Sequence, residues 1–230
     1  MNRTINNTLK SLQKQAETTP DAVVLYSGGK DSIALLDIAM RAFRSVLPLH
    51  FSPMPGLNLT RLLVSETKRI WNVDVECVQD PVRLEDVCNE IYCVAGTESE
   101  LAAYDYTRDE VVLALKGLKG ESYCVLDGQR SDEFFSRRMA MNRSPMSWRL
   151  HPLAKWKTRD VLAWLKSHKL PFYLGNPPQG KGAVCNWDYS LEWMRTEHAE
   201  DYKQWQKLFP FCEAARWRKM WFGDCVYTGG

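Results

Sequence analysis

The strongest constraint on the fold is one strand–loop–helix junction near the N-terminus. The stretch AVVLYSGGKDS (residues 22–32) begins with apolar and β-branched residues and breaks into Ser-Gly-Gly-Lys-Asp-Ser. The residues that follow place apolar side chains at helical spacing, at Ile33, Leu36, Met40 and Phe43. A buried strand that turns through two glycines directly into a helix is typical of parallel α/β proteins.

The same alternation of apolar runs and helical patterns continues along the chain. Asn58 or Thr60 is a candidate N-cap for the second of these helices. The expected strands are residues 22–26, 45–51, 73–78 and 122–128, and the expected helices are residues 31–43, 58–71 and 158–170, with a mostly helical region at 82–117. This order predicts a parallel sheet with helices on both faces and ligands at the carboxyl ends of the strands.

The loop from Ser27 to Ser32 has the composition of a phosphate-binding site. Gly28 and Gly29 permit positive φ and a close approach of the backbone to an anion, and the start of the following helix supplies N–H donors. Lys30 adds a mobile charge, and the two serines add hydroxyls. Asp31 is suited to cap the helix or to hold Mg²⁺ beside a nucleotide. The alternative is an ordinary Gly-Gly turn, and the Walker A spacing is absent.

Several further stretches resemble a known family. The SGGKDS loop resembles the PP-loop of the adenine nucleotide alpha hydrolase-like ATP pyrophosphatases. The segments PLHF, VLDGQRSDEFFSRRMAM and HPLAKWKTRDVLAWLKSHKLPF follow in the order seen in the ATP sulfurylase small subunit and the phosphoadenosine phosphosulfate (PAPS) reductase group. The resemblance covers residues 20–174.

The resemblance implies a five-stranded, mostly parallel, Rossmann-like sheet sandwiched by helices. It implies that the protein binds ATP with Mg²⁺ and cleaves the α–β phosphate bond to adenylate an acceptor, and an alternative is a FAD-synthetase-like adenylyltransferase. The implied catalytic residues are Lys30, Asp31, Arg130 and Arg137, with Asp31 as the Mg²⁺ ligand. The implied nucleotide-binding residues are Ser27, Gly28, Gly29, Lys30, Asp31, Ser32, Gly128, Gln129, Asp132 and Glu133.

The stretch GQRSDEFFSRR supports two interpretations. Arg130 and Arg137 follow the fourth expected strand, and each guanidinium could clamp phosphate or sulfate with two hydrogen bonds. Alternatively, the stretch is a charged helix start in which Glu133 pairs with Arg137 at i,i+4 spacing. Further along the chain, His151 is expected to begin the last strand. Its role could equally be structural or functional.

The sequence departs from the reductases of this group. They end in a Glu-Cys-Gly-x-His segment with a nucleophilic cysteine, whereas this chain ends in WFGDCVYTGG. Cys225 lies beside Asp224, and an acidic neighbour raises a thiol pKa. The seven cysteines contain no close pairs, so we expect no iron–sulfur cluster. Ser52 stands where the sulfurylase subunit has an acid. A divergent reductase, or a non-catalytic nucleotide-binding protein, remains the alternative.

The chain divides into two parts by composition. Residues 1–175 are expected to form the nucleotide-binding α/β domain, and residues 176–230 a Pro/Gly-rich loop with a tryptophan-rich helical extension. The net charge of +2 conceals nine lysines and arginines against one acid between residues 134 and 170. With Trp148, Trp156 and Trp164 interleaved, this segment fits a nucleotide pocket wall or a nucleic-acid track. Alternatively, Trp156 and Trp164 share one helix face and belong to the core.

The sequence also favours a cytoplasmic protein. Its apolar runs are shorter than the roughly 20 residues of a membrane-spanning helix, and its polar N-terminus does not resemble a secretory signal. The expected partner is ATP or a related adenosine phosphate. A protein partner or a homodimer stays open, and nucleic acid is the weaker alternative.

Overall fold

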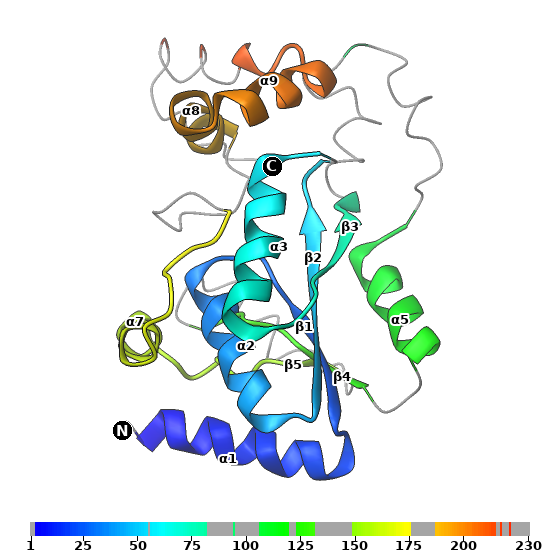
Figure 1. Ribbon diagram of the computed structural model, residues 1–230, viewed down its shortest axis with the longest axis vertical. Coiled ribbons are helices and arrows are strands. Elements are labelled where there is room, and N and C mark those ends of the chain that lie inside the picture. The colour runs from blue at the N-terminus through cyan, green and yellow to red at the C-terminus, as the bar shows by residue number, and fades with distance from the viewer. Residues whose placement is uncertain are drawn as a thin grey trace.

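The computed structural model contains a five-stranded parallel sheet covered by helices (Figure 1). The structure describes residues 3–54, 56–81, 94, 106–119, 123–131, 149–175, 187–214, 217 and 221. The strands are β1 (Asp21–Leu25), β2 (Ser45–Ser52), β3 (Glu76–Gln79), β4 (Tyr123–Leu126) and β5 (Arg149–Leu150). They lie in the order β3-β2-β1-β4-β5, and every neighbouring pair is parallel, which confirms the predicted sheet.

The strand β1 is at the centre, between β2 and β4, so its carboxyl end lies where the direction of winding reverses. Such a reversal is where open α/β sheets bind ligands. Two strand starts were predicted wrongly by more than one residue: β3 begins at Glu76 instead of residue 73, and His151 follows β5 instead of beginning it. The backbone N–H of Asp127 still bonds to the carbonyl of Leu150, but Pro152 has no N–H with which to continue the ladder.

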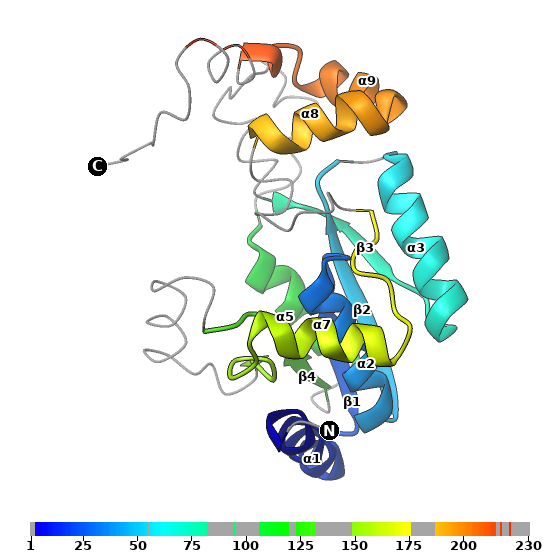
Figure 2. The same cartoon turned by 90° about the vertical axis from the view of Figure 1, so that its left-hand side faces the viewer.

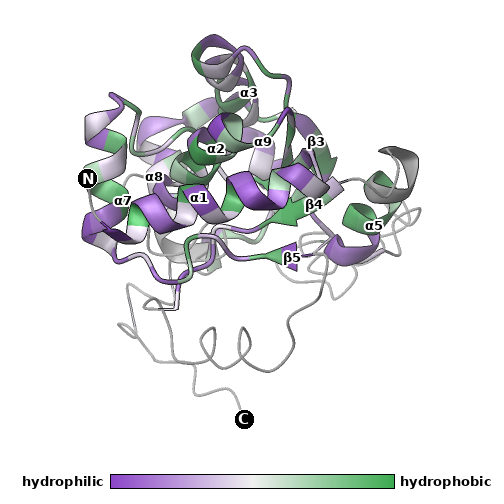
Figure 3. Ribbon diagram, turned by 90° about the horizontal axis from the view of Figure 1, so that it is seen from below, coloured by the Kyte–Doolittle hydropathy of each residue, from purple (hydrophilic) through white to green (hydrophobic). Residues whose placement is uncertain are grey.

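Three helices cover one face of the sheet: α2 (Lys30–Ala42), α3 (Asn58–Trp71) and α7 (Thr158–Ser167). The helix α1 (Arg3–Thr18) packs against α2 near the amino ends of the strands (Figure 1). Ala22 and Val24 of β1 point into this main core, which also contains the buried side of α2. Figure 2 shows α2, α3 and α7 beside the sheet, and Figure 3 shows hydrophobic residues concentrated in the strands and in α2. The period-two alternation of a strand explains why Val23 points to the opposite face.

That opposite face packs against α5 (Arg108–Lys119), through Val23, Leu49, Val112 and Val125. Helices therefore lie on both faces of the sheet, as predicted. Of the region 82–117 that was expected to be mostly helical, residues 82–93 and 95–105 lie outside the described residues.

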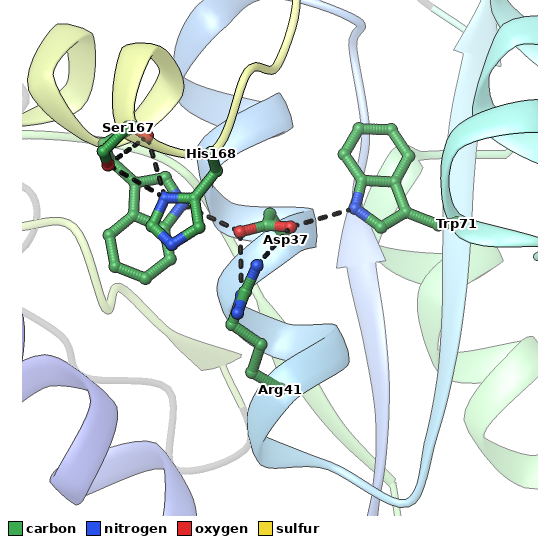
Figure 4. Close-up of polar contacts among 6 residues, drawn as sticks. Asp37, Arg41, Trp71, Ser167 and His168 are labelled. Atoms are coloured by element: carbon green, nitrogen blue, oxygen red, sulfur yellow. Dashed lines mark hydrogen bonds and ion pairs between the residues drawn. The ribbon is translucent and has the colours of Figure 1, made fainter.

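A cluster around Asp37 joins three helices on the first face (Figure 4). The Asp37 carboxylate, only 5% exposed, accepts hydrogen bonds from the indole N–H groups of Trp164 (3.0 Å) and Trp71 (3.2 Å). Arg41 adds a charged donor from the next turn of α2, at 3.0 Å. Trp164 and Trp156 are both buried, so their predicted place in the core is confirmed, and neither is available to stack on a nucleic-acid base. They do not share a helix face, because Trp156 precedes α7.

The helices α8 (Trp187–Glu197) and α9 (Ala199–Leu208) lie beyond the carboxyl edge of the sheet, opposite α1 (Figure 1). They form a second core with the segment that leads into α3, composed of Met54, Leu57, Leu59, Leu191, Met194, Tyr202, Trp205, Phe209 and Cys212. Neither Asn58 nor Thr60 is the N-cap of α3, because Leu57 occupies that position without a side-chain cap. The capping oxygens come instead from Asp201 on α9.

Candidate functional site

The glycine-rich loop connects β1 to α2 at the reversal point of the sheet. Gly28 has a φ of +76°, and a Cβ built there would lie 2.1 Å from the carbonyl oxygen of Leu174. No other residue type fits this position, since a side chain would be strained and would also clash with backbone. Gly29 is the N-cap of α2 with an ordinary φ of −81°, and space for a Cβ exists there.

A segment that follows α7, here called the strap (residues 171–175), crosses the loop. The backbone N–H of Leu174 donates to the carbonyl of Gly28 at 2.7 Å, and Tyr173 forms an antiparallel bridge with Gly29. The strap also needs a glycine, because Gly175 has a φ of +64° and approaches the backbone of Leu59 on α3. The close approach that excludes a side chain at Gly28 is therefore made by the chain itself.

The hydroxyls of the loop are part of its internal structure. The Ser32 hydroxyl donates to the carbonyl of Gly29 at 2.9 Å and accepts the backbone N–H of Ser27 at 3.3 Å. The two serine oxygens lie 3.2 Å apart. The backbone N–H of Gly29 in turn donates to the Ser27 hydroxyl at 3.4 Å. These bonds fold the loop onto the first turn of α2, and a glycine-rich loop that leads into a helix start is a common anion-binding element.

The start of α2 differs from the starts of the helices around it. Asp201 caps α3, Glu110 accepts the backbone N–H of Thr107 before α5, and Asp160 accepts the backbone N–H of Lys157 before α7. The N-cap of α2 is Gly29, which has no side chain to offer. Within the described residues, the first turn of α2 therefore has no side-chain cap of the kind found at α3, and an uncapped helix start favours an anion.

Asp31 lies between two cationic side chains of the site. Its Oδ2 is 2.7 Å from Lys30 Nζ, and its Oδ1 is 2.9 Å from Arg130 Nε, the latter an ion pair rather than an aligned hydrogen bond. Arg130 is 3% exposed, and its Nη1 donates to the hydroxyl of Thr158 at 3.2 Å. The structure therefore brings Lys30, Asp31 and Arg130 together at the loop. Their chemical roles stay predictions.

The residues after β4 lie directly against the start of α2. A Cβ on Gly128 would be 3.5 Å from the backbone of Asp31 and Ser32, so the two loops are in van der Waals contact. The backbone N–H of Gln129 donates to the carboxylate of Asp127 at 3.2 Å, which turns the chain toward Arg130. The other predicted residues of this stretch, Asp132, Glu133 and Arg137, lie outside the described residues.

Two buried residues near the end of β2, Ser52 and His50, bond to different segments. Ser52 is buried, and its hydroxyl donates to the carbonyl of Met54 and contacts the hydroxyl of Thr60, so it shapes the β2–α3 connection. His50 Nδ1 lies 2.9 Å from the carbonyl of Tyr26, the residue that precedes the loop. Burial lowers the pKa of His50 below its ordinary value of 6.5, so the neutral ring donates from Nδ1.

Sequence reasoning missed two features of the site. Thr158 was expected only to open a helix, and its contact with Arg130 depends on tertiary structure that no local pattern shows. The second is a charge network in which Arg149 donates to Asp127 at 2.6 Å and to Asp109 at 3.0 Å. His151 follows it, and partial burial lowers the pKa of its ring, an effect that Asp127 opposes.

Two described cysteines, Cys77 and Cys212, are not activated thiols. Burial raises the pKa of both Cys77 and Cys212, with Glu76 adding to the effect at Cys77. Cys225 lies outside the described residues. No group of three or more His, Cys, Asp or Glu side chains positioned to hold a metal occurs among the described residues. No described helix is long and apolar enough to span a membrane.

A family model and two solved structures are similar to this chain. Residues 21–173 match the family model described as phosphoadenosine phosphosulfate reductase domain. An NH3-dependent NAD synthetase from Campylobacter jejuni, solved with a nitrate ion, is similar with a TM-score of 0.53 at 14% identity, over 97% of this chain and 95% of that one. A PAPS reductase from Candida auris, solved with phosphate, has a TM-score of 0.44 at 16% identity, over 74% of this chain and 87% of that one. No curated protein matches the chain.

Proposed function

The chain belongs to the phosphoadenosine phosphosulfate reductase domain family, and on this premise we propose that it is an ATP pyrophosphatase. It would bind ATP at the glycine-rich loop and transfer the adenylyl group to an acceptor. The proposal rests above all on the complete Ser27–Ser32 loop, folded against an α2 start that has no side-chain cap. A loop of this kind holds phosphates with backbone N–H groups and needs little rearrangement to do so.

The roles of the charged residues follow from their distances. Lys30 has a flexible ammonium 2.7 Å from Asp31, and it can move from this carboxylate onto a phosphate oxygen when a nucleotide arrives. Arg130 is buried and held from two sides, which suits it to a fixed position beside the α-phosphate. There its charge would stabilise the negative charge that develops as the bond breaks.

Asp31 fits a Mg²⁺ ion that arrives with the nucleotide. A carboxylate oxygen is a hard ligand, and Mg²⁺ in nucleotide sites is held by one or two carboxylates together with phosphate oxygens and water. When bound, Mg²⁺ supplies charge neutralisation at the phosphates.

The bond changes are those of adenylyl transfer. A nucleophilic atom of the acceptor forms a bond to the α-phosphorus, and the bond from that phosphorus to the α–β bridging oxygen breaks. The electron pair of the broken bond leaves with pyrophosphate, and the acceptor proton is lost to solvent or to a nearby base. Products are an adenylated acceptor and pyrophosphate, with no oxidation or reduction.

A second candidate function is the binding of a sulfonucleotide such as PAPS at the same loop. The family match over residues 21–173 favours it, since that model is described by a PAPS reductase activity. The described cysteines speak against reduction by a thiolate from this part of the chain, because the thiol pKa values of Cys77 and Cys212 are raised rather than lowered. Sulfonucleotide binding without reduction stays compatible with the site.

The test compares ATP with Mg²⁺ against PAPS and adenosine phosphosulfate, by calorimetry on the reduced protein. ATP labelled at the α-phosphorus reports pyrophosphate release in the same samples. We expect ATP binding that Lys30→Ala weakens at least tenfold, while Lys166→Ala, an exposed lysine on α7, leaves binding unchanged. Tight PAPS binding without ATP cleavage would replace the first candidate with the second. Normal ATP turnover by Lys30→Ala would contradict the loop assignment.

A further inference from the structure

We propose that Thr158 is a positioning residue, whose hydroxyl fixes the guanidinium of Arg130 over the glycine-rich loop. This inference rests on the proposed function, because it gives Arg130 a role toward the nucleotide. The observation behind it is the 3.2 Å hydrogen bond from Arg130 Nη1 to the hydroxyl of Thr158. Thr158 is the first residue of α7, and Arg130 follows β4, so the contact joins two separate parts of the sheet edge.

The guanidinium of Arg130 is held between two helices. Asp31 on α2 lies against Nε at 2.9 Å, and Thr158 on α7 accepts from Nη1 on the other side of the group. The side chain is 4% exposed, so it cannot exchange these partners freely for water. The two contacts differ in kind, because Asp31 offsets the charge whereas a neutral hydroxyl orients the group and leaves its charge in place.

The backbone of the same stretch is fastened to the β5–α7 segment. Both the backbone N–H and the hydroxyl of Ser131 donate to the carbonyl of Ala154, at 3.1 and 2.6 Å. That segment is anchored in turn by Leu153 and Trp156, which are almost completely buried in the main core. Thr158 therefore follows a segment that is held in place by the core, so its hydroxyl can fix the position of the Arg130 guanidinium.

A fixed arginine matters for binding and for catalysis. Arginine side chains have many rotamers, and ordering one of them when the ligand binds opposes association. A guanidinium that is already oriented avoids this cost. Thr158 would therefore act through Arg130, without a contact to the nucleotide of its own.

The test uses the full chain and four variants. Thr158→Val removes the hydroxyl and keeps the shape, and Thr158→Ser keeps the hydroxyl. Because Thr158 is exposed, neither change disturbs the core. We expect Thr158→Val to weaken binding of ATP with Mg²⁺ by about three- to tenfold, and Thr158→Ser to bind like the wild type. In an Arg130→Ala background, Thr158→Val should cause no further loss, since the two residues act as a unit.

A second measurement needs no ligand. In protein labelled with ¹⁵N-arginine, the Nε–H signal of Arg130 is identified by its absence from Arg130→Ala. This signal should shift or broaden in Thr158→Val and return in Thr158→Ser. An unchanged signal in Thr158→Val would overturn the proposal, as would an equal loss of ATP affinity with and without Arg130. If the wild type failed to bind ATP while the signal still moved, the proposed function would fail and the positioning contact would stand.

Discussion

Asp201 on α9 caps the first turn of α3, although 142 residues separate it from Leu59. One carboxylate oxygen accepts the backbone N–H of Asn58 at 2.7 Å, and the other accepts that of Leu59 at 2.8 Å. The carboxylate is almost completely buried and lies at the positive end of the helix dipole. The C-terminal helices therefore fasten the β2–α3 connection, which follows the strand next to the glycine-rich loop.

Asp201→Asn should destabilise the protein by about 1 kcal/mol. The amide keeps one acceptor oxygen but turns an NH2 group toward a backbone N–H and removes the charge. Urea unfolding followed by circular dichroism measures the difference. Glu200→Gln on the same helix is the matched control, because the exposed Lys203 is the one ion-pair partner of its carboxylate among the described residues. Equal effects of the two substitutions would contradict a specific cap.

The two loop glycines should respond differently to alanine. Gly28→Ala forces a side chain into positive φ and against the carbonyl of Leu174, so the strap must move. We expect a loss of more than about 1 kcal/mol in the free energy of unfolding, together with loss of ATP binding. Gly29→Ala meets nothing nearer than 3.5 Å and should fold normally. Thermal melting and calorimetry separate the two effects, and a stable, ATP-binding Gly28→Ala would show that the strap contact is unimportant.

Two buried tryptophans provide another matched pair. Trp164→Phe removes the indole donor to the Asp37 carboxylate, whereas Trp156→Phe removes only a donor to the hydroxyl of Thr8. Both substitutions leave a similar cavity. We expect Trp164→Phe to cost about 1–3 kcal/mol more, because a buried charge loses a partner. Chemical unfolding measures the free energy of unfolding of both variants. A larger loss for Trp156→Phe than for Trp164→Phe would assign Asp37 a smaller structural role.

Much of this fold follows from local pattern, because β-branched runs and helical stripes are short-range signals. The helix predicted at residues 58–71 has those bounds in the structure, and the central strand and its loop are displaced by only one residue. The position of Arg130 beside Asp31 was also accessible, because a residue after one parallel strand lies at the same edge as a loop after its neighbour.

Other features depend on contacts between distant segments and leave no local signal. Asn58 has the composition of an N-cap, yet the capping oxygens come from Asp201. Thr158 reads as an ordinary helix start, and only the tertiary structure brings its hydroxyl to Arg130. In the same way, Gly28 must be glycine because the strap crosses it, and the strap lies too far away in the sequence to be part of any local pattern.

Stability should depend on pH through His50. Burial lowers its pKa in the folded protein, so the unfolded chain binds a proton more readily below about pH 6.5. The stabilising contribution is therefore complete above that pH and is lost as the pH falls through the folded pKa. Asp80 and the carbonyl of Tyr26 oppose the shift without reversing it.

Urea unfolding at pH 7.5 and pH 5.5 tests this dependence. His50→Asn can still donate to the carbonyl of Tyr26 but does not titrate, so it should reduce the difference in unfolding free energy between the two conditions. His151→Asn should reduce this difference in unfolding free energy by less, because His151 is only partly buried and Asp127 favours its charged form. An equal pH dependence in wild type and His50→Asn would mean that the ring becomes protonated in the folded state without cost, which its burial beside the loop argues against.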